Sequence, residues 1–104
     1  MPTVRFSGKA KADLLNIGSY TLETWGEAQA LRYFSNLEDC ANTIAANSPS
    51  GRECDWIRAG LRRFETGRHV IFYRQEKGGI LVVRILHQSM MPERHSFEDQ
   101  PAES

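Results

Sequence analysis

Three short runs rich in β-branched and aromatic residues constrain the fold of this chain more than any other feature. They span residues 57–64, 68–74 and 80–87, and two turns that contain glycine, residues 65–67 and 75–79, separate them. Strand-like runs joined by such short turns are typical of antiparallel hairpins. We therefore expect a three-stranded meander in the second half of the chain.

The predicted meander is basic although the whole protein is neutral. From Arg58 to Arg84 the chain has six arginines and one lysine against two glutamates, a net charge of +5. Non-specific nucleic-acid binding usually needs a strongly basic domain. A neutral chain is a poor candidate for it, and we expect no direct sequence-specific nucleic-acid binding. The local charge still predicts a surface that attracts an acidic group.

The first half of the chain predicts a strand followed by two helices. Residues 3–6 alternate polar and apolar, and Ser7 follows as a candidate N-cap. Residues 24–27 have the spacing of a capping box around Gly26, which predicts a tight helical hairpin. Residues 47–51 end the second helix, and residues 52–56 are predicted to form a connecting loop. The apolar positions at helical spacing are Ala10, Leu14, Ile17, Thr21 and Trp25 in the first helix and Ala30, Phe34, Leu37, Ala41 and Ile44 in the second.

The predicted order β-α-α-β-β-β gives an α+β fold, with a helical hairpin packed on one face of a small, mainly antiparallel, twisted sheet. A chain of 104 residues is one domain. We expect that domain to span residues 1–97 and the acidic residues 98–104 to be disordered. Two helices cover only one face of such a sheet. We therefore expect the other face, which is also largely apolar, to be solvated or to bind a partner.

The remaining sequence signals are negative. No apolar run is long enough for a membrane span and the first residues do not form a signal peptide, so we expect a cytoplasmic protein with no membrane partner. Cys40 and Cys54 lack the spacing of metal ligands, and we expect no metal and no cofactor. The pair Gly78 and Gly79 is predicted to serve only as a hairpin turn.

Three interpretations of the basic sheet remain open from the residues alone. It could be the active site of a nuclease, with histidines as general acids or bases and arginines as phosphate clamps. It could bind an acidic amphipathic segment of another protein, since arginine pairs with carboxylates while its stem packs. It could also be a solvated face of a scaffold. The residues concerned are His69, His87 and His95 together with Arg58, Arg62, Arg68, Arg74 and Arg84.

An ordered set of short sequence motifs resembles those of the ParE toxins of type II toxin–antitoxin systems, within the RelE/ParE superfamily. The resemblance covers about residues 3–97 and implies the fold described above. The matching residues and motifs are Ser7, Ala10, Asp13-Leu14, Ile17, Tyr20, Trp25-Gly26, Gln29-Ala30, Tyr33, Leu37, Pro49, Gly51-Arg52, Gly60-Leu61-Arg62, residues 69–74, residues 84–87 and Met90.

The resemblance implies partners as well as a fold. We expect a ParD-like antitoxin whose flexible, acidic tail folds onto the toxin in a hetero-oligomer, and DNA gyrase as the target of the free toxin, which would not be an enzyme. Ordering such a tail costs several kcal/mol, so we predict an interface larger than about 1,600 Å². The residues expected to bind partners are Arg58, Arg62, Arg74, Arg84, Leu86, His87, Met90 and Arg94.

A ribosome-dependent messenger-RNA interferase of the RelE type is the alternative, beside a non-toxic interaction module. The sheet position where such enzymes favour arginine holds His69, and no tyrosine follows Tyr73. The sheet region has one lysine, Lys77, in a turn. We therefore assign no catalytic residues. Most ParE-like chains read Met-Asp near the end of the last strand, where this chain has Met90-Met91.

Overall fold

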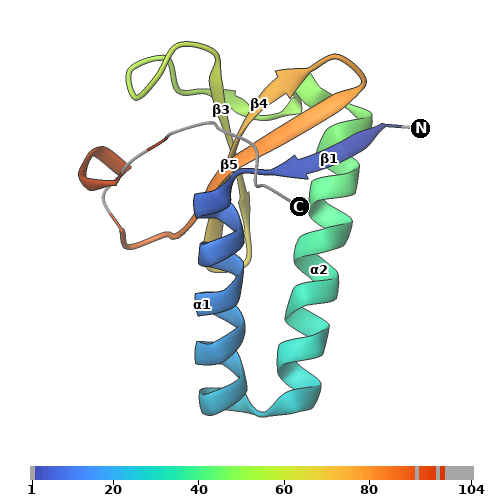
Figure 1. The fold of residues 1–104 in the computed structure, drawn as a ribbon, viewed down its shortest axis with the longest axis vertical. Coiled ribbons are helices and arrows are strands. Elements are labelled where there is room, and N and C mark those ends of the chain that lie inside the picture. The colour runs from blue at the N-terminus through green and yellow to red at the C-terminus, as the bar shows by residue number, and fades with distance from the viewer. Residues whose placement is uncertain (1, 91, 96, 98–104) are drawn as a thin grey trace.

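A computed structural model describes residues 2–90, 92–95 and 97, with two helices packed against a five-stranded sheet (Figure 1). The predicted fold class and element order are confirmed, with one additional two-residue strand. Residues 98–104 lie outside the described part of the chain. The elements are β1 (Thr3–Phe6), α1 (Gly8–Trp25), α2 (Glu27–Ala46), η1 (Ser48–Ser50), β2 (Arg52–Glu53), β3 (Leu61–Thr66), β4 (His69–Glu76), β5 (Gly79–His87) and η2 (Pro92–Arg94).

The strand order in the sheet is β1-β5-β4-β3-β2, and β1 runs parallel to β5 while the other neighbours are antiparallel. Gly78 makes the β4–β5 turn with a φ of 84°. Gly79 has a separate role, because a Cβ atom there would collide with the backbone of Thr3. The prediction that this pair serves only as a turn is therefore wrong: Gly79 also lets β1 pair with the sheet.

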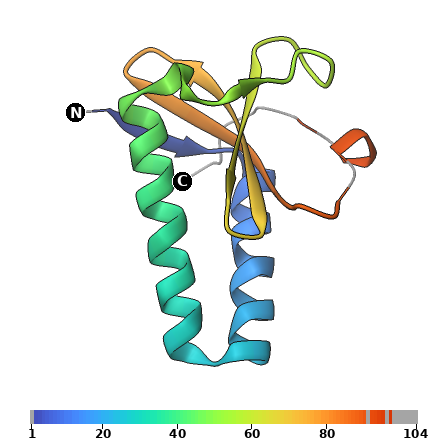
Figure 2. The ribbon, with the colours of Figure 1, turned by 180° about the vertical axis from the view of Figure 1, so that it is seen from behind.

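The helical hairpin begins as predicted but closes differently. The Ser7 hydroxyl accepts a hydrogen bond from the Ala10 amide at 3.0 Å, which confirms the N-cap, and donates one to the Val83 carbonyl at 2.7 Å. Helix α1 continues to Trp25, and no side chain caps α2, so the capping box predicted at residues 24–27 is wrong. Gly26 alone connects the helices, with a φ of 90° that glycine adopts without strain. The closed end of the hairpin extends beyond the sheet (Figure 2).

Each face of the sheet carries its own core cluster. The cluster on the helical side includes Ile17, Leu37, Ile44, Ile71 and Val82. The expectation that the opposite face is left open is wrong, because the loop 54–60 and the chain after β5 fold over it. The second cluster consists of Cys54, Leu61, Val70, Phe72, Leu81, Val83, Leu86 and Phe97, with Ile57 packed against it.

A β-bulge in β5 changes which side chains face the helices. Phe72 on β4 pairs with Arg84 and the next residue, Tyr73, pairs with Val82, so Val83 is an extra residue on β5. Beyond this point the alternation that starts with Ile80 and Val82 on the helical side is broken: Ile85 belongs to the helical-side cluster and Leu86 to the opposite one. An extra residue in a strand reverses the face of the sheet to which the side chains of the following residues point.

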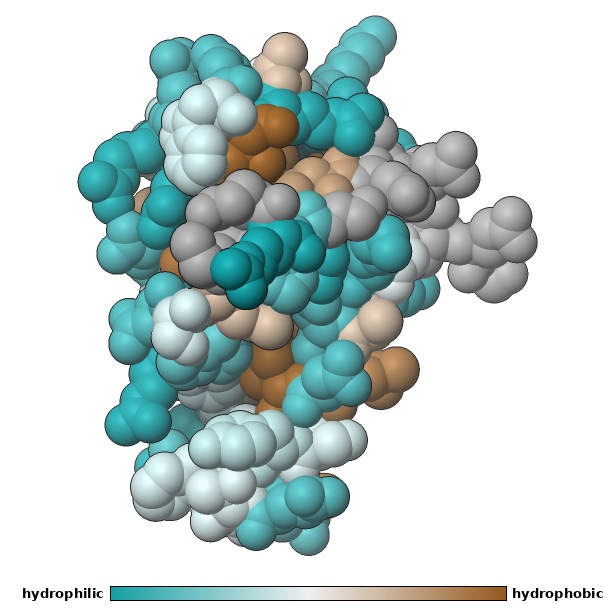
Figure 3. Space-filling model, turned by 90° about the vertical axis from the view of Figure 1, so that its left-hand side faces the viewer, coloured by the Kyte–Doolittle hydropathy of each residue, from teal (hydrophilic) through white to brown (hydrophobic). Residues whose placement is uncertain are grey.

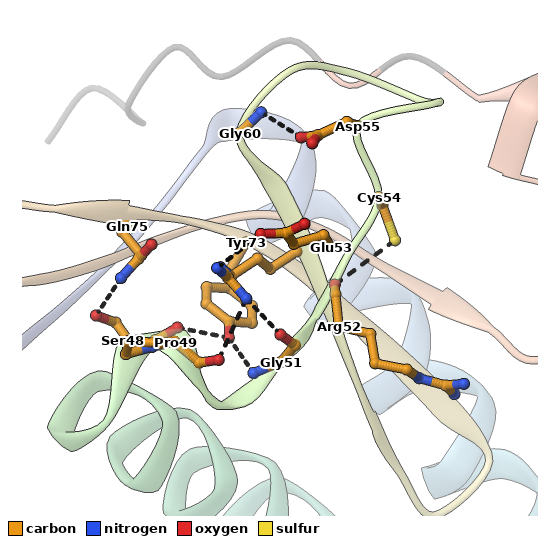
Figure 4. A network of polar contacts seen from close by, with 11 residues as sticks. Ser48, Pro49, Gly51, Arg52, Glu53, Cys54, Asp55, Gly60, Tyr73 and Gln75 are labelled. Atoms are coloured by element: carbon orange, nitrogen blue, oxygen red, sulfur yellow. Dashed lines mark hydrogen bonds and ion pairs between the residues drawn. The ribbon is translucent and has the colours of Figure 1, made fainter.

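The segment before β3 also differs from the prediction. Residues 57–60 form a loop and not the start of a strand, while Arg52–Glu53, predicted as a loop, pairs with β3. The loop 54–60 is closed by the Cys54 amide, which donates to the Leu61 carbonyl at 2.8 Å. The Gly60 amide donates to the Asp55 carboxylate at 3.0 Å (Figure 4). Isolated apolar residues of this loop resemble strand residues in sequence, but they cover the sheet instead of extending it.

Candidate partner-binding surfaces

A mainly apolar cleft of about 420 Å³ opens between the helical hairpin and the sheet, beside β1. Five elements contribute to its lining: β1, α1, α2, β4 and β5. The polar side chains of the lining all come from α2. The lining residues are Val4, Phe6, Leu14, Phe34, Ser35, Leu37, Glu38, Ala41, Asn42, Ile71, Val82 and Ile85. We call this the β1 cleft.

Small residues and a strand edge shape the β1 cleft. Ala41 leaves space where a larger residue of α2 would meet the sheet. Strand β1 is the last in the strand order of the described sheet, so its outer backbone groups face away from β5. An apolar cleft beside an open strand edge suits an extended or helical segment of another protein, which would bring apolar side chains and backbone hydrogen bonds together. Sequence reasoning did not find this cleft, since its residues come from separate elements.

Arg84, predicted to bind a partner, is held inside the protein. Its Nε and Nη2 atoms donate to the two carboxylate oxygens of Asp13 on α1 at 2.8 and 2.9 Å. The same carboxylate accepts from the Ile85 amide at 2.9 Å. Only 13% of the Arg84 side chain and 10% of the Asp13 side chain are exposed. In the sequence, Asp13 was one of the residues that carried the family resemblance. Its burial was not predicted.

Two more predicted residues have roles within the fold. Leu86 is 1% exposed in the second core cluster. Arg62 donates to the carbonyl of Gly51 at 2.7 Å and pairs with Glu53 at 3.3 Å. The Tyr73 hydroxyl binds the same segment after α2: it accepts from the Gly51 amide and donates to the Ser48 carbonyl, each at 2.8 Å (Figure 4). Leu86 becomes available to a partner only if the chain segment that covers it moves.

Arg74 lies half-buried on β4, between Leu61 of β3 and Leu81 of β5 in the register. The other predicted partner residues lie at or near the surface. Arg94 is exposed in η2, and Met90 is 42% exposed. Arg58 is also exposed and donates to the Phe97 carbonyl at 2.8 Å. The eight predicted residues therefore lie on both faces of the sheet and do not form one patch.

A second cleft, of about 340 Å³, lies on the side of the sheet away from the helices. Its lining combines the loop 54–60 with the chain after β5, and none of the described lining residues is acidic. The residues are Trp56, Ile57, Arg58, Pro92, His95 and Phe97. We call it the Trp56 cleft. Trp56 was assigned to a connecting loop from the sequence. The presence of a large aromatic residue in a predicted loop was the one signal in the sequence that could have indicated this cleft.

Two of the candidate histidines meet at the ends of their strands. His69 and His87 are cross-strand partners with ring centroids 5.4 Å apart, and the His69 Nδ1 atom lies at hydrogen-bond distance from the hydroxyl of Tyr33 on α2. Burial lowers the pKa of His69 below its ordinary value, with a further contribution from His87, while Asp13 opposes the shift. Burial also raises the pKa of Tyr33. A neutral imidazole bonded to a protonated phenol braces α2 against the sheet.

One side of the molecule is mainly hydrophilic with small apolar areas (Figure 3). Figure 3 shows a mainly hydrophilic side of the molecule, broken by separate hydrophobic patches, with pale side chains of intermediate hydropathy gathered at the closed end of the hairpin. Within the described residues, neither helix is long and apolar enough to cross a membrane. The described part of this small α+β domain has a cleft on each side of its sheet, and both clefts are open to a partner.

Comparison with known proteins identifies the family. The family model described as "ParE toxin of type II toxin-antitoxin system, parDE" matches residues 4–92. The chain is 42% identical to Toxin ParE1 of Mycobacterium tuberculosis over 90 residues, which cover 86% of this chain and 92% of the relative. It is 39% identical to Toxin ParE1 of Caulobacter vibrioides over 95 residues, which cover 91% and 98%. The chain therefore belongs to the ParE toxin family, and the resemblance read from its sequence is confirmed.

A solved structure supports the fold independently. The structure described as "Chromosomal ParDE TA system from P. aeruginosa" contains a chain that superposes with a TM-score of 0.69 at 23% sequence identity. The match covers 84% of this chain and 96% of that one. At this level of identity the likeness shows a shared fold.

Proposed function

We propose that this protein, as a ParE toxin, stops DNA replication by poisoning DNA gyrase and is neutralised by a ParD-like antitoxin in a hetero-oligomer. The β1 cleft is the observation that carries the antitoxin part of this proposal. It offers a mainly apolar surface beside an open strand edge, which suits a segment that folds as it binds. The toxin would act in the cytoplasm, where its target lies.

The cost of ordering the antitoxin sets the size of its interface. A disordered tail loses several kcal/mol of conformational free energy on binding. The complex is therefore expected to bury more than about 1,600 Å² in total. The β1 cleft by itself is too small for that area, so the tail would continue along the hairpin or over the basic sheet. Since Arg84 is paired with Asp13, it would not be the residue that meets an acidic side chain of the tail.

A non-enzymatic action is part of the proposal. Tyr33, His69 and His87 are residue types that a ribonuclease uses, and they motivate the RelE-like activity as the alternative. The nearby arginine on β5, Arg84, is bound to Asp13 and so does not reach out to a phosphate. The arrangement supports the helical hairpin, and the proposal gives it no part in cleaving a substrate.

Purified components test the proposal directly. The toxin should inhibit supercoiling by gyrase and increase cleaved DNA, and an equimolar amount of the cognate antitoxin should reverse both effects. In cells, induction should raise the DNA damage response while messages stay intact. Ribosome-dependent cleavage of messages without a damage response would instead establish the RelE-like activity. His69→Ala and His87→Ala variants that fold should remain toxic, because neither side chain is proposed to transfer a proton.

A further inference from the structure

Exposed apolar side chains are concentrated on the helical hairpin. Among the described residues, seven large hydrophobic side chains are exposed, and five of them lie between residues 15 and 31. These five are Leu15, Tyr20, Leu22, Trp25 and Leu31. Isolated exposed apolar residues need no explanation, but a group of them in one part of the fold is typical of a surface that another molecule covers. The hairpin is therefore a candidate docking surface.

Two leucines define one face of α1. Leu15 is 73% exposed and Leu22 is 51% exposed. They are seven residues apart, which is about two helical turns, so both lie on the same face of the helix. Ser19 is exposed between them on this face, and its small side chain lets a second helix approach closely. The buried residues of α1 lie on the opposite face: Ala10, Asp13, Ile17 and Thr21. We use the name α1 face for Lys11, Leu15, Ser19 and Leu22.

The exposed charges of α1 are placed against the helix dipole. Lys9 and Lys11 are exposed in the first turn, and Glu23 is exposed in the last turn. The first turn contains no acidic residue and the last turn contains no basic one. A helix is stabilised by acidic groups near its N-terminus and by basic groups near its C-terminus, so both ends of α1 have the unfavourable sign. A second helix that runs in the opposite direction supplies the missing charge at each end.

We propose that a second copy of this chain covers the α1 face, with the two α1 helices antiparallel about a two-fold axis near Ser19. Leu15 of each copy then packs against Leu22 of the other. At a rise of about 1.5 Å per residue, Lys11 of one copy lies about 4.5 Å along the helix axis from Glu23 of the other, an offset that the two side chains can span. A parallel arrangement would place lysine beside lysine and glutamate beside glutamate, which is repulsive.

The charges favour a second copy over a different partner. The α1 face combines two leucines with opposite charges at the two ends of its helix, so it is complementary to itself under two-fold symmetry. The whole chain has no net charge, and therefore no overall repulsion opposes self-association. The antitoxin is proposed to occupy the β1 cleft, to which α1 contributes Leu14. The α1 face lies outside the lining of this cleft, and the inference is independent of the target of the toxin.

The oligomeric state of the isolated toxin tests the inference. A single pair of helices forms a small interface, so we expect a reversible dimer with a Kd on the order of 10 µM. Sedimentation velocity from about 1 to about 200 µM should follow its formation. Leu15→Glu and Leu22→Glu should each weaken the dimer about 30-fold or more, because a carboxylate would be buried against an apolar side chain. Trp56→Glu is the matched control at a 67% exposed position outside the hairpin, and it should dimerise normally. A toxin that stays monomeric, or a dimer that survives both leucine substitutions, overturns the inference.

Charge reversal tests the antiparallel arrangement. Lys11→Glu and Glu23→Lys should each weaken the dimer about fivefold, and the double variant should recover the affinity of the unmodified toxin. Each single substitution also gives one end of α1 the sign that the helix dipole favours. The thermal stability of the monomer should therefore be unchanged or slightly higher, so that a weaker dimer does not follow from a weaker fold. A double variant that recovers no affinity overturns the antiparallel arrangement.

The antitoxin is the alternative occupant of the α1 face. Leu22→Glu should bind the antitoxin within about twofold of the unmodified toxin, as for an ordinary surface substitution. If the toxin is monomeric and this variant loses about tenfold or more in antitoxin affinity, the face belongs to the antitoxin and the inference is overturned.

A cross-link tests the position of the two-fold axis. The two Ser19 side chains should lie beside each other at this axis, so diamide should convert Ser19→Cys into a disulfide-linked dimer. Ser50→Cys, at an exposed position in η1, is the control and should stay unlinked. Equal cross-linking of the two variants overturns the proposed axis.

Discussion

Asp13 on α1 and Arg84 on β5 form a bidentate ion pair that fastens the helical hairpin to an inner strand of the sheet. Both N–O distances are below 3 Å, at 2.8 and 2.9 Å. The ion pair lies next to the β-bulge in β5: Arg84 is the cross-strand partner of Phe72, and the amide of the next residue, Ile85, donates to the same carboxylate. A charge that would otherwise be available on the basic sheet is neutralised inside the protein.

Asp13→Ala should destabilise the protein strongly. The substitution leaves the Arg84 guanidinium buried without its carboxylate and the Ile85 amide without an acceptor. Breaking a buried pair in this way costs about 3–5 kcal/mol, which chemical denaturation would measure. Asp39→Ala, at an exposed position of α2, should change stability by less than about 0.5 kcal/mol. The double variant Asp13→Leu with Arg84→Leu should regain much of the loss; no recovery would show that shape, and not charge, limits this site.

Phe97→Ala should loosen the second core cluster. Phe97 is 7% exposed and covers Phe72, so its loss removes the aromatic contact and exposes apolar side chains of the sheet. We expect a loss of about 3 kcal/mol in the free energy of unfolding, together with increased binding of an apolar dye. Phe97→Leu should lose less. Leu31→Ala, at a 63% exposed position, provides the control. Unchanged stability of Phe97→Ala would mean that the loop 54–60 covers this face alone.

Ala41→Leu should block the antitoxin without harming the fold. The larger side chain would project into the β1 cleft, which has room for it. Affinity for the antitoxin should fall about tenfold or more, equivalent to about 1.4 kcal/mol, in a titration of the purified proteins. Stability should be unchanged or slightly higher, since no packing is removed. Ala12→Leu makes the same change at an exposed position of α1 and should bind normally. If both variants bind alike, the antitoxin does not use this cleft.

His69 should make the stability of the protein depend on pH. Burial holds the native pKa of His69 below the value of about 6.5 expected in the unfolded chain. The unfolded state therefore binds the proton first as pH falls. The contribution of neutral His69 to the free energy of unfolding is fully present above about pH 6.5, and it is lost as the pH falls through the lower native pKa. Unfolding free energies measured from about pH 7.5 to about pH 5 should decrease in this range, and His69→Gln should flatten the curve. An equally steep curve in that variant would assign the effect to other groups.

Gly79→Ala should detach β1 from the sheet. A Cβ atom at this position meets the backbone of Thr3, and neither side of the contact is a flexible side chain. We expect a loss of about 1–3 kcal/mol and faster amide exchange in β1. At Gly8 an added Cβ has nothing within 4 Å, so Gly8→Ala should leave stability unchanged or raise it slightly. Protected β1 amides in the Gly79→Ala variant would contradict this explanation.

The sequence predicted local structure where one segment contained the whole signal. The N-cap at Ser7, the two helices and the strands around Ile71 and Val82 all follow from periodicity and turn residues a few positions apart. The ordered motifs that resemble the family extend over most of the chain, and they were sufficient to indicate the family. These features depend on spacing, and spacing is visible in a linear chain.

The tertiary structure decided how the faces of the sheet are used. One extra residue, Val83, reversed the facing of Ile85 and Leu86, and nothing in the alternating apolar run marks a bulge. The return of Phe97 over the sheet depends on contacts between residues 25 positions apart, and the Asp13–Arg84 pair on contacts 71 apart. Local patterns predict strands and helices because neighbouring residues determine them. Which arginine remains at the surface depends on which distant carboxylate the fold brings beside it.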